Sequence, residues 1–193
     1  MNETRSILFT GVGGQGIILA SKILSRALID AGYDVKMSEV HGMAQRGGSV
    51  TTQVRFGKKV DSPIIGIGQA DILVSFERME AVRWINHLKK GGTAIINDYQ
   101  IPSAPILIGV KDYPTGIDEF IKGHFNTLIF DASEVAKKVG NIRTMNVIMV
   151  GALAKALDLE EINWEHVIEK EVKEQFIELN KKAFKEGYDL KSE

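Results

Sequence analysis

The stretch FTGVGGQGIILA constrains the fold of this chain more than any other part of it. Residues 5–11 contain a short apolar run bounded by glycine, which predicts a buried strand. Residues 14–31 carry apolar side chains at three- and four-residue spacing, which predicts an amphipathic helix. Between the two runs, glycines from Gly11 to Gly16 have the spacing GxGxxG. A strand, a glycine turn and a helix in this order are typical of nucleotide-binding α/β folds, in which the turn brings a phosphate to the helix N-terminus.

The rest of the chain largely repeats the order of strand and helix. Further strands are expected at residues 33–39, 49–57, 71–76, 91–98, 106–110 and 126–131, and helices at residues 77–88, 132–139, 143–157 and 164–183. Such alternation implies a mainly parallel sheet covered on both faces. We therefore predict a single domain over residues 1–193 with a Rossmann-like, three-layer α/β fold and a helical C-terminal region.

The strand at residues 49–57, SVTTQVRFG, departs from the usual order of dinucleotide-binding folds. Its apolar and polar side chains alternate, which predicts a strand with one buried face. A dinucleotide-binding half would place a crossover helix between its second and third strands. Here a glycine-rich loop leads directly into the strand, which weakens the interpretation that the chain binds NAD.

Composition and charge exclude several classes of function. The formal net charge is -1, so no overall field attracts the chain to nucleic acid or to an anionic membrane. Cysteine is absent, which excludes disulfides, thiolate-bound iron–sulfur clusters and cysteine nucleophiles. No apolar run approaches the ~18 residues of a membrane span, and the histidines lack metal-ligand spacing. We therefore expect a cytoplasmic protein without a metal site that binds neither nucleic acid nor a membrane.

The glycine turn is the first candidate site. Its backbone N–H groups and the positive end of the following helix dipole suit a phosphate or a carboxylate. Glu39 ends the second predicted strand, where an NAD enzyme keeps a ribose-binding acid. The alternative is that the glycines only allow a tight turn that packs the helix against the sheet.

The loop SEVHGMAQRGGSV, residues 38–50, is the second candidate site. It follows the carboxyl end of a strand, and ligands bind at that edge of open α/β sheets. Arg46 offers a planar fork of donors for a carboxylate or phosphate, and Gly47 and Gly48 allow a close approach to the backbone. The alternative is a surface loop with a salt-bridged arginine. His41 stands without a second group that would complete a catalytic dyad, so no catalytic residue is expected.

Taken together, the motifs resemble a known family. ILFTGVGGQG, SEVHGMAQRGGSV, TTQVRFG, DILVSFERMEAVRW and NVIMVGAL follow one another as in the gamma-type domain of the 2-oxoacid:ferredoxin oxidoreductases. Within that family, the motif HGMAQRGG most resembles that of the small subunit of the indolepyruvate ferredoxin oxidoreductases. The resemblance covers nearly the whole chain and is far more specific than GxGxxG alone.

The resemblance implies a subunit that is required for catalysis but is inactive alone. In this family, complexes decarboxylate a 2-oxoacid on thiamine diphosphate, pass electrons through iron–sulfur clusters to ferredoxin and release an acyl-CoA. The larger chain holds thiamine diphosphate, magnesium and the clusters, and coenzyme A is a co-substrate. By carry-over, the residues that face the partner chain and its thiamine or CoA pocket are Gly13, Gly14, Gln15, Gly16, Met43, Gln45, Arg46, Gly47 and Gly48.

Three alternatives stay open at this point. The chain could be the gamma subunit of another 2-oxoacid oxidoreductase, specific for pyruvate, 2-oxoglutarate or a branched-chain acid. It could instead be a stand-alone NAD-dependent dehydrogenase that uses Gly11, Gly13, Gly16 and Glu39. It could also be a nucleotide-binding scaffold or sensor module.

Overall fold

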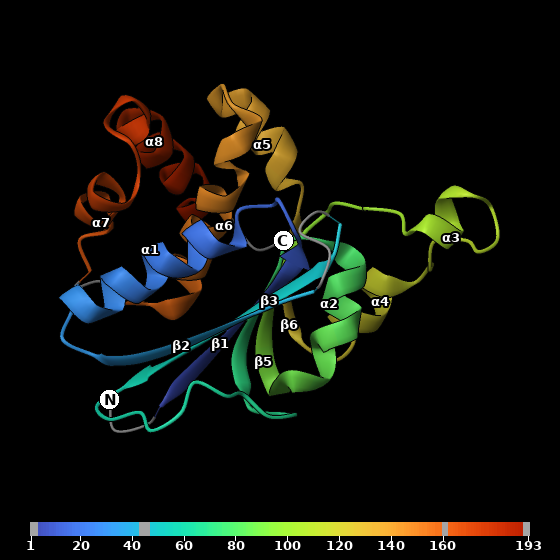
Figure 1. Ribbon diagram of the computed structural model, residues 1–193, viewed down its shortest axis with the longest axis horizontal. Coiled ribbons are helices and arrows are strands. Elements are labelled where there is room, and N and C mark those ends of the chain that lie inside the picture. The colour runs from blue at the N-terminus through green and yellow to red at the C-terminus, as the bar shows by residue number, and fades with distance from the viewer. Residues whose placement is uncertain (1–3, 43–46, 160–161, 191–193) are drawn as a thin grey trace.

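The computed structural model describes residues 4–42, 47–159 and 162–190. Its centre is a six-stranded sheet with the strand order β2-β3-β1-β4-β5-β6 (Figure 1). The strands are β1 (Arg5–Val12), β2 (Asp34–His41), β3 (Ser49–Gly57), β4 (Ala70–Ser75), β5 (Leu88–Asn97) and β6 (Asn126–Phe130). Only β3 runs against the others, since it pairs antiparallel with both β1 and β2 while β1, β4, β5 and β6 pair in parallel. The prediction of a mainly parallel sheet is confirmed.

Helices cover both faces of the sheet, as predicted. One face carries α1 (Ile17–Asp30), α5 (Ala132–Val139), α6 (Met145–Leu157), α7 (Trp164–Glu171) and α8 (Ile177–Tyr188), with the short turns η2 (Ile142–Thr144) and η3 (Glu174–Phe176) between them. The other face carries α2 (Arg78–Trp84), η1 (Ile85–His87) and α4 (Ile117–Lys122), and α3 (Ala104–Leu107) projects from the body on a loop (Figure 1). The three-layer α/β fold with a helical C-terminal region is therefore confirmed.

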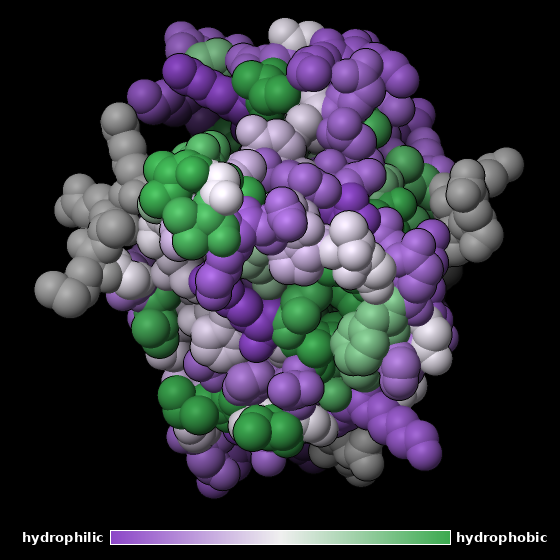
Figure 2. Space-filling model, turned by 90° about the vertical axis from the view of Figure 1, so that its right-hand side faces the viewer, coloured by the Kyte–Doolittle hydropathy of each residue, from purple (hydrophilic) through white to green (hydrophobic). Residues whose placement is uncertain are grey.

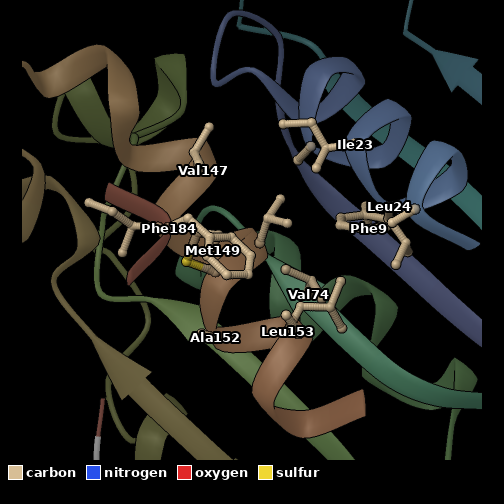
Figure 3. Packing of buried hydrophobic residues seen from close by; sticks show 14 of the residues in the cluster. Phe9, Ile23, Leu24, Val74, Val147, Met149, Ala152, Leu153 and Phe184 are labelled. Atoms are coloured by element: carbon tan, nitrogen blue, oxygen red, sulfur yellow. The ribbon is translucent and has the colours of Figure 1, made fainter. Parts of the chain in front are cut away.

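Two apolar cores lie on the two faces of the sheet. Phe9 of β1 and Val74 of β4 pack with Leu24 of α1 and Leu153 of α6 (Figure 3). Leu8, the neighbour of Phe9, faces the other core, which includes residues of α2 and α4. Successive side chains of a strand point to opposite faces, so a strand covered on both sides is apolar on both. This explains the consecutive apolar residues Ile7, Leu8 and Phe9 of β1.

Helices α6 and α8 lie in backbone contact. A Cβ built on Gly151 would collide with the carbonyl oxygen of Phe184, and one built on Gly187 would collide with that of Ile148. The two helices run in the same direction, because Lys155 near the end of α6 donates to the carbonyl oxygen of Leu190 just beyond α8. Their N-terminal ends therefore lie at the same end of this helix pair.

The apolar residues 106–110 do not form the predicted strand. They belong to α3 and to the turn after it, and the side chains of Leu107 and Ile108 are 71% and 74% exposed. Pro105 lies at the start of this short helix, and Gly109 with φ +74° follows its end. Figure 2 faces the side from which α3 projects and shows green apolar groups within a mostly hydrophilic surface. The prediction was wrong because an apolar run does not by itself indicate burial.

Both faces of β3 are buried, whereas alternation predicted one. On the face predicted to be exposed, Thr51 and Gln53 are only 2% and 9% exposed. Gln53 Oε1 accepts a hydrogen bond from the N–H of Ile65 at 2.6 Å, and Arg55 donates to the carbonyl oxygen of Ser62 at 3.0 Å. The polar face of β3 is thus covered by the loop before β4, to which its side chains bond. Within the described residues, no helix is long and apolar enough to cross a membrane.

Candidate functional site

The glycine loop joins the carboxyl end of β1 to the N-terminus of α1. Gly14 and Gly16 have φ values of +102° and +81°, which residues with a side chain rarely adopt. Gly16 is the N-cap of α1, where no side chain accepts from the helix N–H groups, and the first turn contains no acidic residue. The positive end of this helix dipole is therefore open to an anion.

The side chain of Gln15 turns inward and holds the loop in place. Its Oε1 accepts from the N–H of Val12 at 2.7 Å, and its Nε2 donates to the carbonyl oxygen of Phe76 at 2.8 Å. A Cβ on Gly11 would meet Gln15 Oε1 at 2.8 Å and the Cβ of Phe76 at 2.9 Å, so glycine is needed for this close packing. The Gln15 amide thus ties the ends of β1 and β4 together.

The two predicted loops lie side by side. Val12 pairs with Ser49, because β1 and β3 are antiparallel neighbours. The N–H of Gly13 donates to the carbonyl oxygen of Gly48 at 2.9 Å. Gly47 has φ +78° and precedes this contact. Met43, Gln45 and Arg46, the remaining candidates of the second loop, lie outside the described residues.

A cavity of about 760 Å³ lies over the glycine loop. Its lining consists of Val12, Gly13, Gly14, Gln15, Gly16, Ile17, Ile18, His41, Gly42 and Val50. The volume falls in the range of about 300–1,000 Å³ that is usual for small-molecule sites. The N–H groups of Gly14 and Gly16 donate to no described residue. The cavity therefore combines apolar walls, free backbone donors and an imidazole, a set that can bind an anion but supplies no nucleophile and base pair.

Asn146 supports the glycine loop from the other end of the chain. Its Nδ2 donates to the carbonyl oxygen of Gly16 at 3.2 Å, and its Oδ1 accepts from the N–H of Val147 at 3.0 Å. Asn146 lies near the start of the helix predicted at residues 143–157, and its contact with Val147 is local. The bond to Gly16 spans 130 residues, and no local pattern signals it.

The Glu77 side chain connects the start of α2 with the segment after β5 and the segment before α4. It is 1% exposed and caps α2, with Oε2 accepting from the N–H of Glu80 at 2.9 Å. Its Oε1 accepts from the N–H of Ile101 at 3.1 Å and from the hydroxyl of Tyr113 at 2.8 Å. The predicted place of Glu77 at a helix start is confirmed. Burial, and then the adjacent Glu77 carboxylate, raise the pKa of the Tyr113 hydroxyl.

Glu80 links α2 to the start of β3. Its Oε2 accepts from the hydroxyl of Ser49 at 2.6 Å, and its Oε1 lies 2.9 Å from Arg83 Nη1. Burial raises the pKa of the Glu80 carboxyl above its ordinary value, and the bond from Ser49 and the charge of Arg83 oppose this rise. The Glu77 carboxylate adds to it. Ser49, near the end of the second loop, therefore donates to a buried carboxyl group.

Glu39 does not line the cavity over the glycine loop. It pairs with Thr52 of β3, and its Oε2 lies 3.5 Å from His41 Nε2. In dinucleotide-binding folds, the strand that carries the ribose-binding acid lies next to β1. Here β3 lies between β1 and β2. Glu39 of β2 is therefore farther from the glycine loop by one strand spacing, about 5 Å. The geometry disfavours the NAD-binding alternative.

Comparisons with known proteins identify the family of the chain. Residues 6–190 match the family described as pyruvate ferredoxin/flavodoxin oxidoreductase. The protein named indolepyruvate oxidoreductase subunit IorB from Thermococcus kodakarensis is 43% identical over 94% of this chain and 93% of its own length. The protein of the same name from Pyrococcus horikoshii is 42% identical, with the same shares covered.

A solved structure shows the same fold. The gamma subunit of a keto/oxoacid ferredoxin oxidoreductase from Geobacter sulfurreducens superposes with a TM-score of 0.70 at 26% identity, over 96% of each chain. The resemblance inferred from the loop motifs is thereby confirmed. The chain belongs to the pyruvate ferredoxin/flavodoxin oxidoreductase family.

Proposed function

We propose that the chain is the small subunit of a 2-oxoacid:ferredoxin oxidoreductase whose substrates are aryl pyruvates, indolepyruvate among them. The names of the two relatives above 40% identity support this substrate class. A subunit specific for pyruvate, 2-oxoglutarate or a branched-chain acid is the second candidate. Location in the cytoplasm stays a prediction.

The cofactors belong to a larger partner subunit in this proposal. The chain has no cysteine, so it cannot ligate an iron–sulfur cluster through thiolates. Thiamine diphosphate, magnesium and the clusters are assigned to the partner, and ferredoxin is reached through the complex. In the overall reaction the C1–C2 bond of the oxoacid breaks and CO₂ leaves. The CoA sulfur bonds to the remaining carbonyl carbon, the thiol proton is released, and two electrons pass to ferredoxin.

The contact between Gly13 and Gly48 is the observation that carries the proposal. It fixes the second loop beside the uncapped N-terminus of α1, so that the N–H groups of Gly14 and Gly16 border one cavity with His41 and Gly42. Such an edge suits a phosphate of CoA or an anionic edge of the partner. The roles proposed for this chain are to bind and orient that group, with Arg46 as an added fork of donors.

Reconstitution tests this function. The full chain is co-expressed with a candidate large subunit, and ferredoxin reduction is followed with indolepyruvate, pyruvate and 2-oxoglutarate, each with and without CoA. We expect a stable complex that reduces ferredoxin with indolepyruvate only when CoA is present. Faster reduction with pyruvate or 2-oxoglutarate would support the second candidate, and absence of a complex would contradict both.

Arg46→Ala tests the second loop in the same assay. Loss of a charge-assisted hydrogen bond predicts a KM for CoA about tenfold higher, while the variant subunit still assembles. Arg26→Ala is the matched control, because Arg26 pairs only with Asp30 on the exposed surface of α1. If Arg46→Ala has the kinetics of the wild type, Arg46 does not contribute to the site.

A further inference from the structure

A second cavity, of about 360 Å³, lies where the start of α6, the segment before α8 and the first turns of α8 meet α1. Its volume is within the usual range of small-molecule sites. Leu19 of α1, Val172, Phe176 and Leu179 form apolar walls. Phe176 stays 39% exposed although it borders these apolar neighbours. The walls fit the apolar body of a small molecule.

Cations without partners lie at this cavity. Arg143 and Lys173 line it, and neither side chain forms a hydrogen bond or ion pair with any described residue. The other described arginines all have partners. These are Arg5, Arg26, Arg55, Arg78 and Arg83. Glu171 also lines the cavity, so two positive charges face one negative charge. The balance favours an anion.

Helix dipoles act in the same direction. The N-terminal ends of α6 and α8 both border the cavity, and these helices have 13 and 12 residues. Neither N-cap residue, Thr144 or Phe176, caps its helix with a side chain. Each helix continues a 3₁₀ turn that accepts from its first N–H group, and Glu178 lies in the first turn of α8. The helix dipoles therefore add only modestly to the positive charge of Arg143 and Lys173.

Asn180 provides a buried polar group at the same place. It is 8% exposed and lines the cavity, and its Nδ2 donates to the carbonyl oxygen of Phe176 at 2.8 Å. Its Oδ1 accepts from no described residue. This oxygen is not sealed from solvent, so it does not require a ligand. The Nδ2 atom has a second N–H, which Asn180 can donate to an anion.

We propose that this cavity binds a small organic anion with an apolar body. The acidic head lies beside Arg143 and Lys173, and the body packs on Leu19, Phe176 and Leu179. Asn146 lines this cavity and also donates to Gly16, so the occupant touches a group that holds the N-cap of α1. The proposal does not depend on the function proposed above.

Titration of the full ¹⁵N-labelled chain with 2-naphthoate tests the proposal, with 2-naphthalenemethanol and acetate as comparators. We expect 2-naphthoate to shift the amide signals of Asn146, Val172, Phe176 and Asn180. Its affinity should exceed that of the neutral alcohol by about tenfold, the ratio that loss of one charge-assisted contact predicts. Acetate at the same concentration should shift none of these signals, because it lacks the apolar body.

The double variant Arg143→Gln/Lys173→Gln should bind 2-naphthoate about tenfold more weakly, close to the alcohol. Both side chains are exposed and make no described polar contact, so the variant should keep the wild-type Tm. Lys58→Gln/Lys90→Gln removes the same charge from exposed positions elsewhere and should bind as the wild type does. Any of three results would overturn the proposal. The wild type could bind 2-naphthoate and the alcohol with equal affinity, the shifted signals could be confined to residues 13–18, or Arg143→Gln/Lys173→Gln could bind 2-naphthoate as the wild type does.

Discussion

Buried carboxylates at the start of α2 fix the segments around the candidate site. Glu77 receives hydrogen bonds from Ile101 and Tyr113, and Glu80 receives one from Ser49. Since Glu80 is 4% exposed, the ionised form loses hydration that these contacts only partly replace. The raised pKa of Glu80 follows from that loss and makes stability depend on pH.

Glu80→Gln should change this pH dependence. The folded state binds the Glu80 proton more tightly than the unfolded chain does. Its contribution to stability is complete below the ordinary value of 4.5 and is lost as pH rises through the raised pKa. The Tm of the wild type minus that of Glu80→Gln should therefore fall as pH rises from about 4 to 7. Thermal denaturation across this range measures it, with the exposed Glu174→Gln as the charge-matched control. A difference that grows with pH would contradict the assignment.

At the residue scale, local roles could be predicted and distant partners could not. Glu77 is the first residue of the helix predicted at residues 77–88, so its place at a helix start could be predicted. The inward bonds of Gln15 and the bond from Asn146 to Gly16 depend on how distant segments pack. The sequence did not indicate Arg143 as a binding residue either. A cation without a partner is recognised only when the surrounding structure is known.

At the scale of elements, α6 and α8 depend on two glycines for their close packing. A Cβ on Gly187 would collide with backbone atoms of Ile148, which cannot move as a flexible side chain would. Alanine also favours a helix over glycine by up to about 1 kcal/mol. Overpacking typically opposes this with about 1–3 kcal/mol. The balance predicts destabilisation.

Gly187→Ala should lower the Tm by roughly 4–8 °C, since the net cost at the upper end of this balance is about 2 kcal/mol and about 1 kcal/mol corresponds to 2–4 °C in a chain of this size. Glu186→Ala, an exposed change on the same helix, should stay within about 2 °C of the wild type. Both values come from thermal denaturation followed by circular dichroism. A higher Tm for Gly187→Ala would mean that the two backbones are not in contact.

The sequence predicted best those elements whose faces are all covered by other parts of the protein. The centre of β1 is apolar on both faces because both are covered, and the helix expected at residues 143–157 is present as η2 and α6. α3 was predicted as a strand because apolar residues were assumed to be buried. α4 was not expected, since its short helix follows Gly116 in a loop without a clear period. Local patterns carry no information on whether a segment packs or projects.

At the scale of the whole molecule, the position of β3 determines what the glycine loop can bind. β3 separates β2 from β1 and brings Gly48 against Gly13. The sequence predicted a strand at residues 49–57, but not its two neighbours in the sheet, because strand order is decided by long-range pairing. The same insertion moves Glu39 away from the loop that it would serve in an NAD enzyme.

NAD should therefore leave the Tm of the full chain unchanged at millimolar concentration. A ligand at 100 times its Kd would stabilise the folded state by about 2.7 kcal/mol, so specific binding would be visible by differential scanning fluorimetry. ADP is the control for binding of the adenylate half alone. A rise in Tm with NAD that exceeds the rise with ADP would restore the dehydrogenase alternative.

The tip formed by α3 affects how the chain behaves in solution. Leu107, Ile108 and Val110 are each more than two-thirds exposed, and a net charge of -1 supplies little repulsion between molecules. Isolated copies are consequently poorly protected from aggregation at high concentration. Purification at low concentration would limit that risk in the laboratory.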